Sequence, residues 1–252
     1  MTRAPDMPPL RGYAICGEAR SGSIFLCHLL RSTGLLGRPT EFFHDAAVAR
    51  EVVAAPETIL ARLVEAAATP NGVYGLKVFT RHFEQVAAAR WAERLPGLGF
   101  VSLTRADVLG QAISLARAVQ TGQYKLGDPW EGEPRYDSAL IADCLARIVY
   151  GQARWESWFA RNGIAPLRLV YEQVVEAPQE AVDAIARLAG LDAPAPIDLS
   201  QVEVRVQRDA ATLEWRERFV REKRDLGYLD GGRLFSRLGR GAALARWFLG
   251  PR

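Results

Sequence analysis

The feature that most constrains the fold is a Gly- and Ser-containing loop between two apolar segments near the start of the chain. Residues 13–16 form a short apolar run (Tyr-Ala-Ile-Cys) that predicts a buried strand. Residues 24–31 are apolar nearly all round, as expected for a helix buried against a sheet, and Gly34 is a suitable end for that helix. A strand that leads through the loop at residues 17–23 into a buried helix predicts the first unit of an α/β fold.

The same alternation of apolar runs and amphipathic segments continues along the chain. Further strands are predicted at residues 73–79, 100–104 and 167–171. Helices are predicted at residues 57–68, 83–94, 107–120, 138–161 and 178–188, with Asp107 as a cap at the start of its helix. This alternation favours right-handed βαβ units, so we predict a P-loop-like three-layer α/β fold with a mostly parallel central sheet flanked by helices. Ligands of such folds bind at the carboxyl ends of the strands.

The composition excludes several classes of protein. The chain has 252 residues, 49% of them hydrophobic and 24% charged, which fits a single domain over residues 1–252 and argues against a disordered or fibrous chain. The net charge of +3 is small for a nucleic-acid-binding protein, so we expect no nucleic-acid partner. No signal peptide is visible, and no apolar stretch approaches the roughly 20 residues that span a bilayer. We therefore expect a cytoplasmic protein.

The cysteines and histidines carry no metal-site pattern. The cysteines are scattered and form no Cys-x-x-Cys pair, which favours buried free thiols in a reducing compartment. The histidines lack the spacing of metal ligands, so we predict no metal site. The residues concerned are Cys16, Cys27, Cys144, His28, His44 and His82.

Two departures from the Walker A pattern change what the loop can bind. Gly17 and Gly22 have the G-x-x-x-x-G spacing of a Walker A loop, which directs backbone N–H groups and a helix N-terminus at an anion. Walker A loops continue with Lys and then a Ser or Thr that holds Mg²⁺, whereas this chain has Ser23 and Ile24. Arg20 supplies a cation inside the loop instead. The loop therefore predicts a site for an anion that needs no Mg²⁺; the alternative is a plain Gly/Ser turn that caps the helix.

Five segments, taken in order, resemble a known family. These segments lie at residues 17–23, 38–43, 71–77, 104–121 and 206–215, so the resemblance covers roughly residues 12–225. The chain resembles bacterial sulfotransferases that use 3′-phosphoadenosine 5′-phosphosulfate (PAPS), and more narrowly the trehalose 2-sulfotransferase-like family. The resemblance implies PAPS as co-substrate, PAP (the 3′,5′-bisphosphate) as product, a carbohydrate or glycolipid acceptor and a homodimer. This sequence departs from the family pattern at Glu18, Ile24 and Gly110.

The resemblance also implies roles for individual residues. Glu41 corresponds to the glutamate of the family's Glu-Phe-Phe segment, which is the proposed general base. The expected catalytic residues are Glu41, Arg20 and Lys77. The expected PAPS-binding residues are Arg20, Ser21, Gly22, Ser23, Arg105, Ser114, Gln207 and Arg208. The expected acceptor-binding residues are Phe42, His44, Arg117 and Gln120.

Elementary chemistry supports several of these roles and leaves alternatives open. A positioned carboxylate that removes the proton of a sugar hydroxyl accelerates attack by roughly 10²–10⁴-fold, which suits Glu41, with His44 as the rival base. Arg105 supplies the bidentate cation, and Ser114 the hydroxyl, that a 3′-phosphate needs. Lys77 lies in an apolar strand, where an unpaired ammonium is costly, so it either faces the donor or pairs with an acid.

The end of the chain and the overall function also leave alternatives. From about residue 229 the chain is a basic tail that can be mobile, with arginines among apolar residues. This tail forms either a docked helix or a peripheral contact with an anionic membrane. We predict transfer of a sulfuryl group from PAPS to a carbohydrate or glycolipid hydroxyl. The alternatives are a non-catalytic PAP- or PAPS-binding protein and, less favoured, a P-loop kinase.

Overall fold

A four-stranded parallel sheet forms the centre of the computed structural model, which describes residues 8–124, 132–192, 194–202 and 210–227. The strands are β1 (Arg11–Gly17), β2 (Val73–Phe79), β3 (Leu98–Thr104) and β4 (Leu167–Val170), in the spatial order β2-β1-β3-β4. All three strand pairs are parallel. The predicted parallel α/β sheet is confirmed, and all four strands begin and end within two residues of the predicted bounds.

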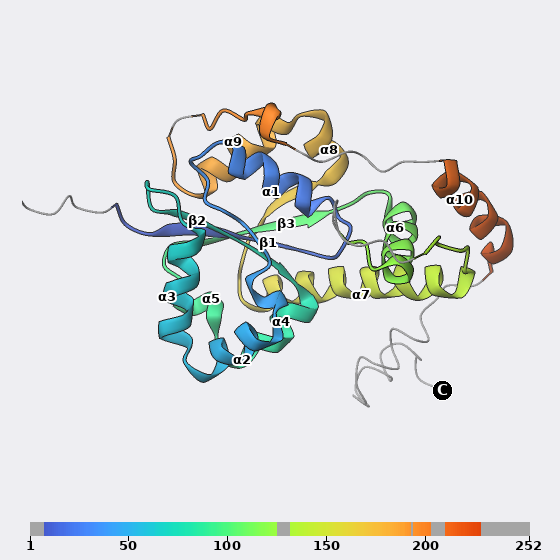
Figure 1. Ribbon diagram of the computed structural model, residues 1–252, viewed down its shortest axis with the longest axis horizontal. Coiled ribbons are helices and arrows are strands. Elements are labelled where there is room, and N and C mark those ends of the chain that lie inside the picture. The colour runs from blue at the N-terminus through green and yellow to red at the C-terminus, as the bar shows by residue number, and fades with distance from the viewer. Residues whose placement is uncertain (1–7, 125–131, 193, 203–209, 228–252) are drawn as a thin grey trace, which may run out of the picture.

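The carboxyl ends of the strands meet at one edge of the sheet. Gly17, the last residue of β1, pairs with Phe79 of β2 and with Leu103 of β3. The chain passes from β1 to β2 on one side and then crosses to β3 on the other side of β1 (Figure 1). A change of direction of this kind opens a crevice at the end of the central strand, where α/β proteins bind ligands.

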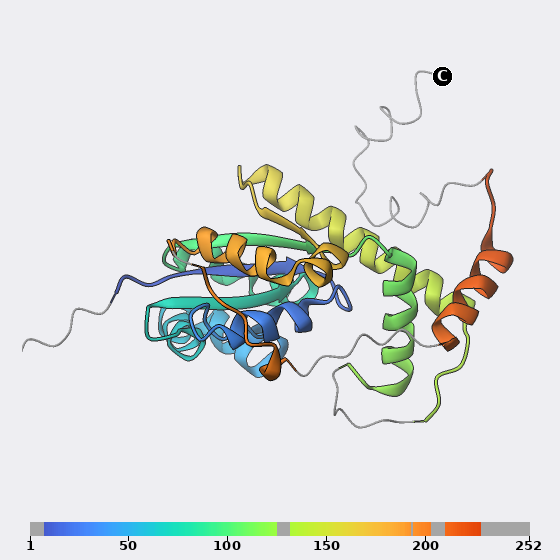
Figure 2. The ribbon, with the colours of Figure 1, turned by 90° about the horizontal axis from the view of Figure 1, so that it is seen from above.

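Helices cover both faces of the sheet, so the predicted three-layer arrangement is confirmed (Figure 1). One face carries α1 (Ser23–Ser32), α8 (Tyr171–Glu176) and α9 (Pro178–Leu188). The opposite face carries α2 (Ala46–Ala54), α3 (Pro56–Ala67), α4 (Thr80–Val86), α5 (Trp91–Arg94) and α7 (Ser138–Arg161). Helices α6 (Val108–Thr121) and α10 (Ala210–Lys223) lie beyond the carboxyl edge of the sheet (Figure 2).

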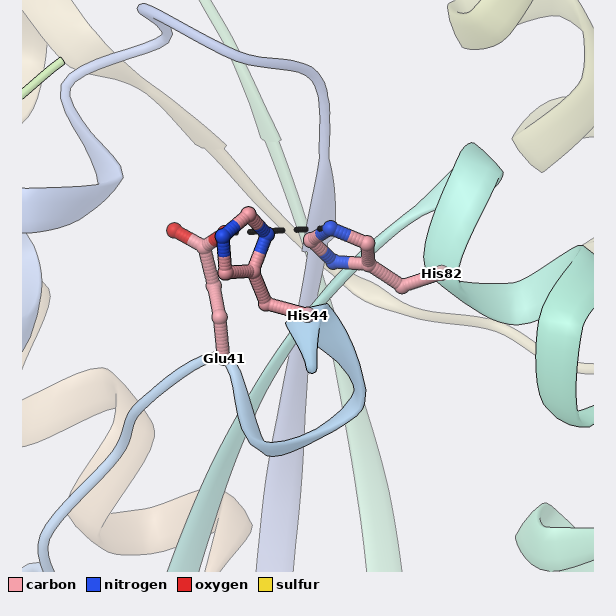
Figure 3. A group of neighbouring side chains, drawn as sticks. All are labelled: Glu41, His44 and His82. Atoms are coloured by element: carbon pink, nitrogen blue, oxygen red, sulfur yellow. Dashed lines mark ion pairs between the residues drawn. The ribbon is translucent and has the colours of Figure 1, made fainter. Parts of the chain in front are cut away.

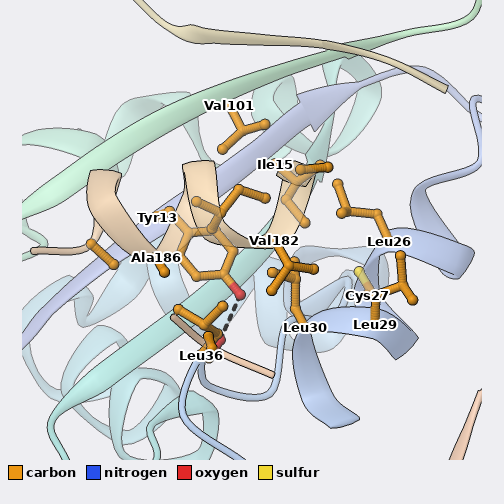
Figure 4. Close-up of a cluster of buried hydrophobic side chains, with 14 of the residues drawn as sticks. Tyr13, Ile15, Leu26, Cys27, Leu29, Leu30, Leu36, Val101, Val182 and Ala186 are labelled. Carbon is orange, nitrogen blue, oxygen red and sulfur yellow. Dashed lines mark hydrogen bonds between the residues drawn. The ribbon is translucent and has the colours of Figure 1, made fainter. Parts of the chain in front are cut away.

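Alternating side chains of β1 build the two cores. Tyr13 and Ile15 are buried against α1 and α9, as Figure 4 shows, and the Tyr13 hydroxyl donates to the backbone oxygen of Leu36 at 2.5 Å. Ala14 and Cys16 point to the opposite face and join the second core. This alternation follows from the two-residue period of a strand whose two faces are both covered.

One predicted helix is broken in the structure. The segment predicted as a helix at residues 83–94 consists of α4, which begins earlier at Thr80, a 3₁₀ turn (Ala87–Ala89) and the short α5. Arg90 has a φ of 49°, a left-handed conformation that ends the helical path. This turn brings Trp91, only 1% exposed, into the core against Phe43 and Phe83. Burial of Trp91 therefore overrides the helical periodicity of the segment.

Other predicted elements agree with the structure, whereas some helices were not predicted. The bounds of α7 and β2 are those predicted, and the Asp107 side chain caps α6 by accepting from the Gly110 N–H. The sequence did not predict α2 or α8. No helix among the described residues has the length and apolar character needed to cross a membrane. Gln207, Arg208 and the predicted tail lie outside the described residues, and the single-domain assignment stays a prediction.

Candidate active site

The loop between β1 and α1 has the features of an anion site. Gly22, at the N-cap of α1, has a φ of 84°, and Arg20 has a φ of 64°. No side chain of the described residues caps α1, so its first N–H groups lack that partner. The Ser21 hydroxyl is buried, at 1% exposure of the residue, and has no hydrogen-bond partner among the described residues. A buried hydroxyl is normally paired, so an unpaired one beside an uncapped helix indicates a ligand site.

Side chains from α7, from α6 and from the segment after β3 hold the backbone carbonyls of this loop. The Trp155 indole of α7 donates to the Gly17 oxygen at 3.1 Å. Gln111 of α6 donates through Nε2 to the Ala19 oxygen at 2.8 Å. Arg105 donates through Nη1 to the Arg20 oxygen at 3.5 Å. The loop is thus fixed from outside before any ligand arrives.

Three of the predicted PAPS-binding residues come together around the loop. Arg20 donates through Nε to the Ser114 hydroxyl at 2.9 Å and through Nη1 to the Tyr124 oxygen at 2.5 Å. Arg105 lies on the other side of Arg20, at its backbone oxygen. The sequence analysis predicted that Arg105 and Ser114, nine residues apart, bind the same 3′-phosphate. In the structure both residues contact Arg20.

Two residues of this region were missed by the sequence analysis. The guanidinium of Arg105 lies 5.4 Å from the ring centroid of Tyr171, and its Nε is 3.8 Å from Glu172 Oε1. The Tyr171 ring also packs against Gly22, since a Cβ at that glycine would lie 2.0 Å from the ring. Tyr171 and Glu172 directly follow β4, at the carboxyl edge of the sheet. Their position after a predicted strand is the sequence feature that could have identified them.

Glu41 forms a nearly buried ion pair with Lys77. Glu41 Oε1 lies 2.6 Å from Lys77 Nζ, and the side chains are 13% and 5% exposed. The backbone fixes this approach, because Thr40 bridges to Leu76 and the Lys77 N–H donates to the Thr40 oxygen at 2.9 Å. Of the two alternatives for Lys77, the structure has the pairing with an acid.

Two histidines, His44 and His82, lie beside Glu41 (Figure 3). Glu41 Oε2 is 3.9 Å from His82 Nε2, and that nitrogen accepts from Arg81 Nε at 3.0 Å. His82 is 1% exposed, and burial together with the Arg81 charge lowers its pKa to about 4, so it is neutral at pH 7. His44, the predicted rival base, is exposed and meets the His82 ring edge-on at 5.5 Å. His82 was not among the expected site residues, because only the fold brings it to Glu41.

The group Glu41, His44 and His82 has potential metal-ligand atoms within 4.8 Å of one another. The surrounding charges fit a divalent cation poorly. The Lys77 ammonium already occupies one carboxylate oxygen, and Arg81 donates to the His82 nitrogen that faces Glu41. The absence of a metal site stays a prediction.

The predicted acceptor residues are not gathered in one place. Phe42 packs on the core near Glu41. Arg117 donates through Nη1 to the Thr212 hydroxyl of α10 at 2.9 Å, and Gln120 bonds both backbone groups of Arg135. Gln120 lines a cavity of about 430 Å³ between α6, α7 and α10, whose other residues include Tyr136. Phe42 and His44 are therefore beside Glu41, whereas Arg117 and Gln120 lie in contacts of α6 with other elements.

The fold and the loop define an α/β protein built to hold an anion at the end of its central strand. Comparison with known proteins narrows this class: the family model of Stf0 sulphotransferase matches residues 12–222. The chain belongs to this family of sulfotransferases, and its trehalose 2-sulfotransferase-like character, predicted from five motifs, is confirmed. The prediction of a sulfotransferase enzyme, with PAPS as the donor general to the family, is likewise confirmed and is favoured over a kinase.

Two curated relatives have the same name, trehalose 2-sulfotransferase. The protein from Mycobacterium tuberculosis is 30% identical, over 86% of this chain and 97% of its own. The protein from Mycolicibacterium smegmatis is 26% identical, over 83% of this chain and 94% of its own. Among solved structures, the sulfotransferase domain of the Synechococcus PCC 7002 olefin synthase matches with a TM-score of 0.43 and 14% identity, over 100% of this chain and 99% of that one. A similarity this low carries no weight in the assignment, which rests on the family model and the relatives.

Proposed function

We propose that this sulfotransferase holds PAPS at the loop between β1 and α1 and passes its sulfuryl group to a carbohydrate hydroxyl that Glu41 deprotonates. One observation carries the proposal. The loop begins at Gly17, the last residue of β1. Lys77, which pairs with Glu41, lies on β2 directly beside Ile15 of β1, two residues before Gly17. Two residues of a strand span about 7 Å, so an anion at the loop and a proton at Glu41 lie within reach of one small substrate.

The loop supplies the groups that a phosphosulfate needs. The Ser21 hydroxyl, the uncapped N-terminus of α1 and the Arg20 cation offer donors and positive charge without a metal ion. Arg105 and Ser114, which both contact Arg20, are the proposed ligands of the 3′-phosphate. Gln207 and Arg208 remain proposed from the sequence alone.

The transfer is an in-line displacement at sulfur. Glu41 removes the acceptor's hydroxyl proton, the oxygen forms a bond to sulfur, and the bond between sulfur and the phosphate oxygen of the donor breaks. PAP leaves with the negative charge, which the cations and N–H groups of the loop stabilise. Lys77 pairs with the Glu41 carboxylate before the transfer, and it is the proposed partner of the sulfuryl oxygens once Glu41 has taken the acceptor's proton.

The acceptor is proposed to be a sugar of the trehalose class. Both curated relatives are named for sulfation of trehalose, at 26% and 30% identity over most of their length. Phe42 and His44 lie beside Glu41 and are the proposed contacts of the acceptor there. The alternative acceptor is a glycolipid that carries such a sugar.

The test is to incubate the purified protein with sulfur-labelled PAPS and a panel of sugars that includes trehalose. We expect a labelled sugar with the wild-type protein and a loss of roughly 10²–10⁴-fold in turnover with Glu41→Gln. PAP should raise the melting temperature of both proteins, whereas ATP with Mg²⁺ should not. Stabilisation by ATP and Mg²⁺ in place of PAP would refute the donor assignment, and an unchanged turnover in Glu41→Gln would refute the base.

We also propose a cytoplasmic homodimer whose basic tail contacts a membrane surface. The family resemblance supports the dimer, and the arginines among apolar residues at positions 234–249 support the tail contact. Light scattering of the purified protein tests the dimer. Sedimentation with anionic vesicles, with and without residues 229–252, tests the tail.

A further inference from the structure

Glu18 is an acid inside a loop that binds an anion. Its carboxylate turns to the first turn of α4, where Oε1 accepts from the Thr80 hydroxyl at 2.7 Å and from the Thr80 N–H at 3.4 Å. The loop of one strand is thereby tied to the helix that follows the neighbouring strand. That helix also carries His82, which lies beside Glu41, and Arg81, which donates to His82.

A glycine in α7 makes room for this carboxylate. A Cβ at Gly151 would lie 2.3 Å from Glu18 Cδ and 2.4 Å from Oε1. Glycine costs roughly 1 kcal/mol relative to alanine within a helix. Its presence in the middle of α7 is explained by the space that Glu18 needs.

The charges around Glu18 come from two helices. Arg81 of α4 and Arg147 of α7 both act on it, and Thr80 supplies two hydrogen bonds. Burial is the larger effect, and it raises the pKa of Glu18 to about 7 despite those bonds and charges. The carboxyl group is therefore poised to change its protonation state when the charge beside it changes.

We propose that Glu18 is a positioning residue that ties the donor loop to α4 and takes up a proton when the anionic donor binds. This inference rests on the proposed function. Negative charge placed at the loop disfavours the neighbouring carboxylate, and a proton from solvent removes that repulsion. The protonated group still accepts the Thr80 hydroxyl on Oε1, so the tie to α4 survives the change.

Proton uptake can be measured directly. Calorimetric titration of PAP into the protein at pH 8, in buffers of different ionisation enthalpy, gives the number of protons bound per PAP. We expect the wild-type protein to take up on the order of half a proton or more beyond Glu18→Gln, because both proteins share the titration of PAP itself. Glu84→Gln is the matched control, since Glu84 is an exposed acid of α4 paired with Arg154, and it should match the wild type.

The outcomes separate this inference from the proposed function. PAP binding with equal proton uptake in wild type and Glu18→Gln would overturn the inference alone. No PAP binding by any of the three proteins would contradict the proposed function. The tie itself has a separate readout: Glu18→Ala, which loses the bond to Thr80, should raise KM for PAPS several-fold relative to Glu18→Gln. Equal KM values for these two variants would mean that Glu18 does not position the loop.

Discussion

Two polar side chains of the loop between β1 and α1 differ in their hydrogen bonding. The Ser21 hydroxyl has no partner among the described residues, whereas Glu18 accepts two hydrogen bonds from Thr80. An unpaired buried hydroxyl costs stability, and a paired carboxylate fixes geometry. Ser21 is therefore a proposed contact of the ligand, and Glu18 is proposed to hold the loop in place.

This difference predicts an unusual result for Ser21→Ala. Removal of an unpaired hydroxyl should leave the melting temperature of the free protein unchanged or slightly higher. PAP affinity should fall about 10- to 100-fold, since a hydrogen bond to a charged ligand contributes about 1.5–3 kcal/mol. Calorimetry and thermal unfolding measure the two effects. A lower melting temperature with unchanged PAP affinity would mean that Ser21 is a structural residue.

The Glu41–Lys77 pair predicts strong coupling between two variants. Lys77→Met leaves a carboxylate at 13% exposure without its partner and should lower the free energy of unfolding by roughly 3 kcal/mol. Adding Glu41→Gln removes the charge that Lys77 no longer balances and should restore part of that loss. Denaturant unfolding of the wild type, the two single variants and the double variant measures the coupling. Additive effects would show that the pair contributes little.

The sequence predicted much of the site at the level of residues, but not all of it. The sequence grouped Arg20, Arg105 and Ser114, and the structure brings them into contact, although their role in PAPS binding stays a prediction. His82 and Tyr171 were missed, because their roles depend on which strand ends lie side by side. The pairing of Lys77 with Glu41 was left open for the same reason.

At the scale of elements, periodicity located those that bury one continuous face. The bounds of α7 and β2 agree with the prediction, and both are long or strongly apolar. The segment from α4 to α5 was predicted as one helix, because its break depends on the left-handed Arg90 and on the burial of Trp91. No local signal distinguishes that segment from a continuous amphipathic helix.

The contact of α7 with the loop gives an element-scale prediction. Gly151→Ala would normally stabilise a helix by roughly 1 kcal/mol. Here the added methyl group meets the Glu18 carboxylate, so we expect lower stability and weaker PAP binding. Thermal unfolding measures the stability of Gly151→Ala, and calorimetry measures its affinity for PAP. In a Glu18→Ala background the methyl group has room, and the same substitution should become stabilising; destabilisation in both backgrounds would contradict the proposed contact.

At the scale of the whole molecule, the stability of the protein depends on pH through Glu18 of the loop and His82 of α4. These two groups have opposite effects on the free energy of unfolding. Burial raises the pKa of Glu18 from 4.5 to about 7, so its stabilising contribution is present at low pH and is lost as the pH rises to 7. Burial lowers the pKa of His82 from 6.5 to about 4, so its contribution is present above 6.5 and is lost as the pH falls to 4. Between pH 4.5 and 6.5 the two slopes nearly cancel.

Substitution of either group should expose the slope of the other. In Glu18→Gln, the free energy of unfolding should rise by up to about 3 kcal/mol from pH 4 to 6.5, because Glu18 no longer opposes the effect of His82. In His82→Gln it should fall by a similar amount from pH 4.5 to 7. Urea unfolding across this pH range measures both. Parallel pH profiles for the wild type and both variants would contradict the assigned pKa shifts.

The strand order has a consequence for the growing chain during translation. β1 is synthesised early, but the strands that pair with it come later, β2 from Val73 and β3 from Leu98. The hydrogen-bond donor to its last carbonyl, the Trp155 indole, is synthesised later still. A nascent polypeptide that has left the ribosome only as far as α6 therefore lacks the indole that secures the donor loop. The enzyme should gain its affinity for nucleotide late in synthesis, and shortened chains that end before α7 should emerge inactive and in need of chaperones.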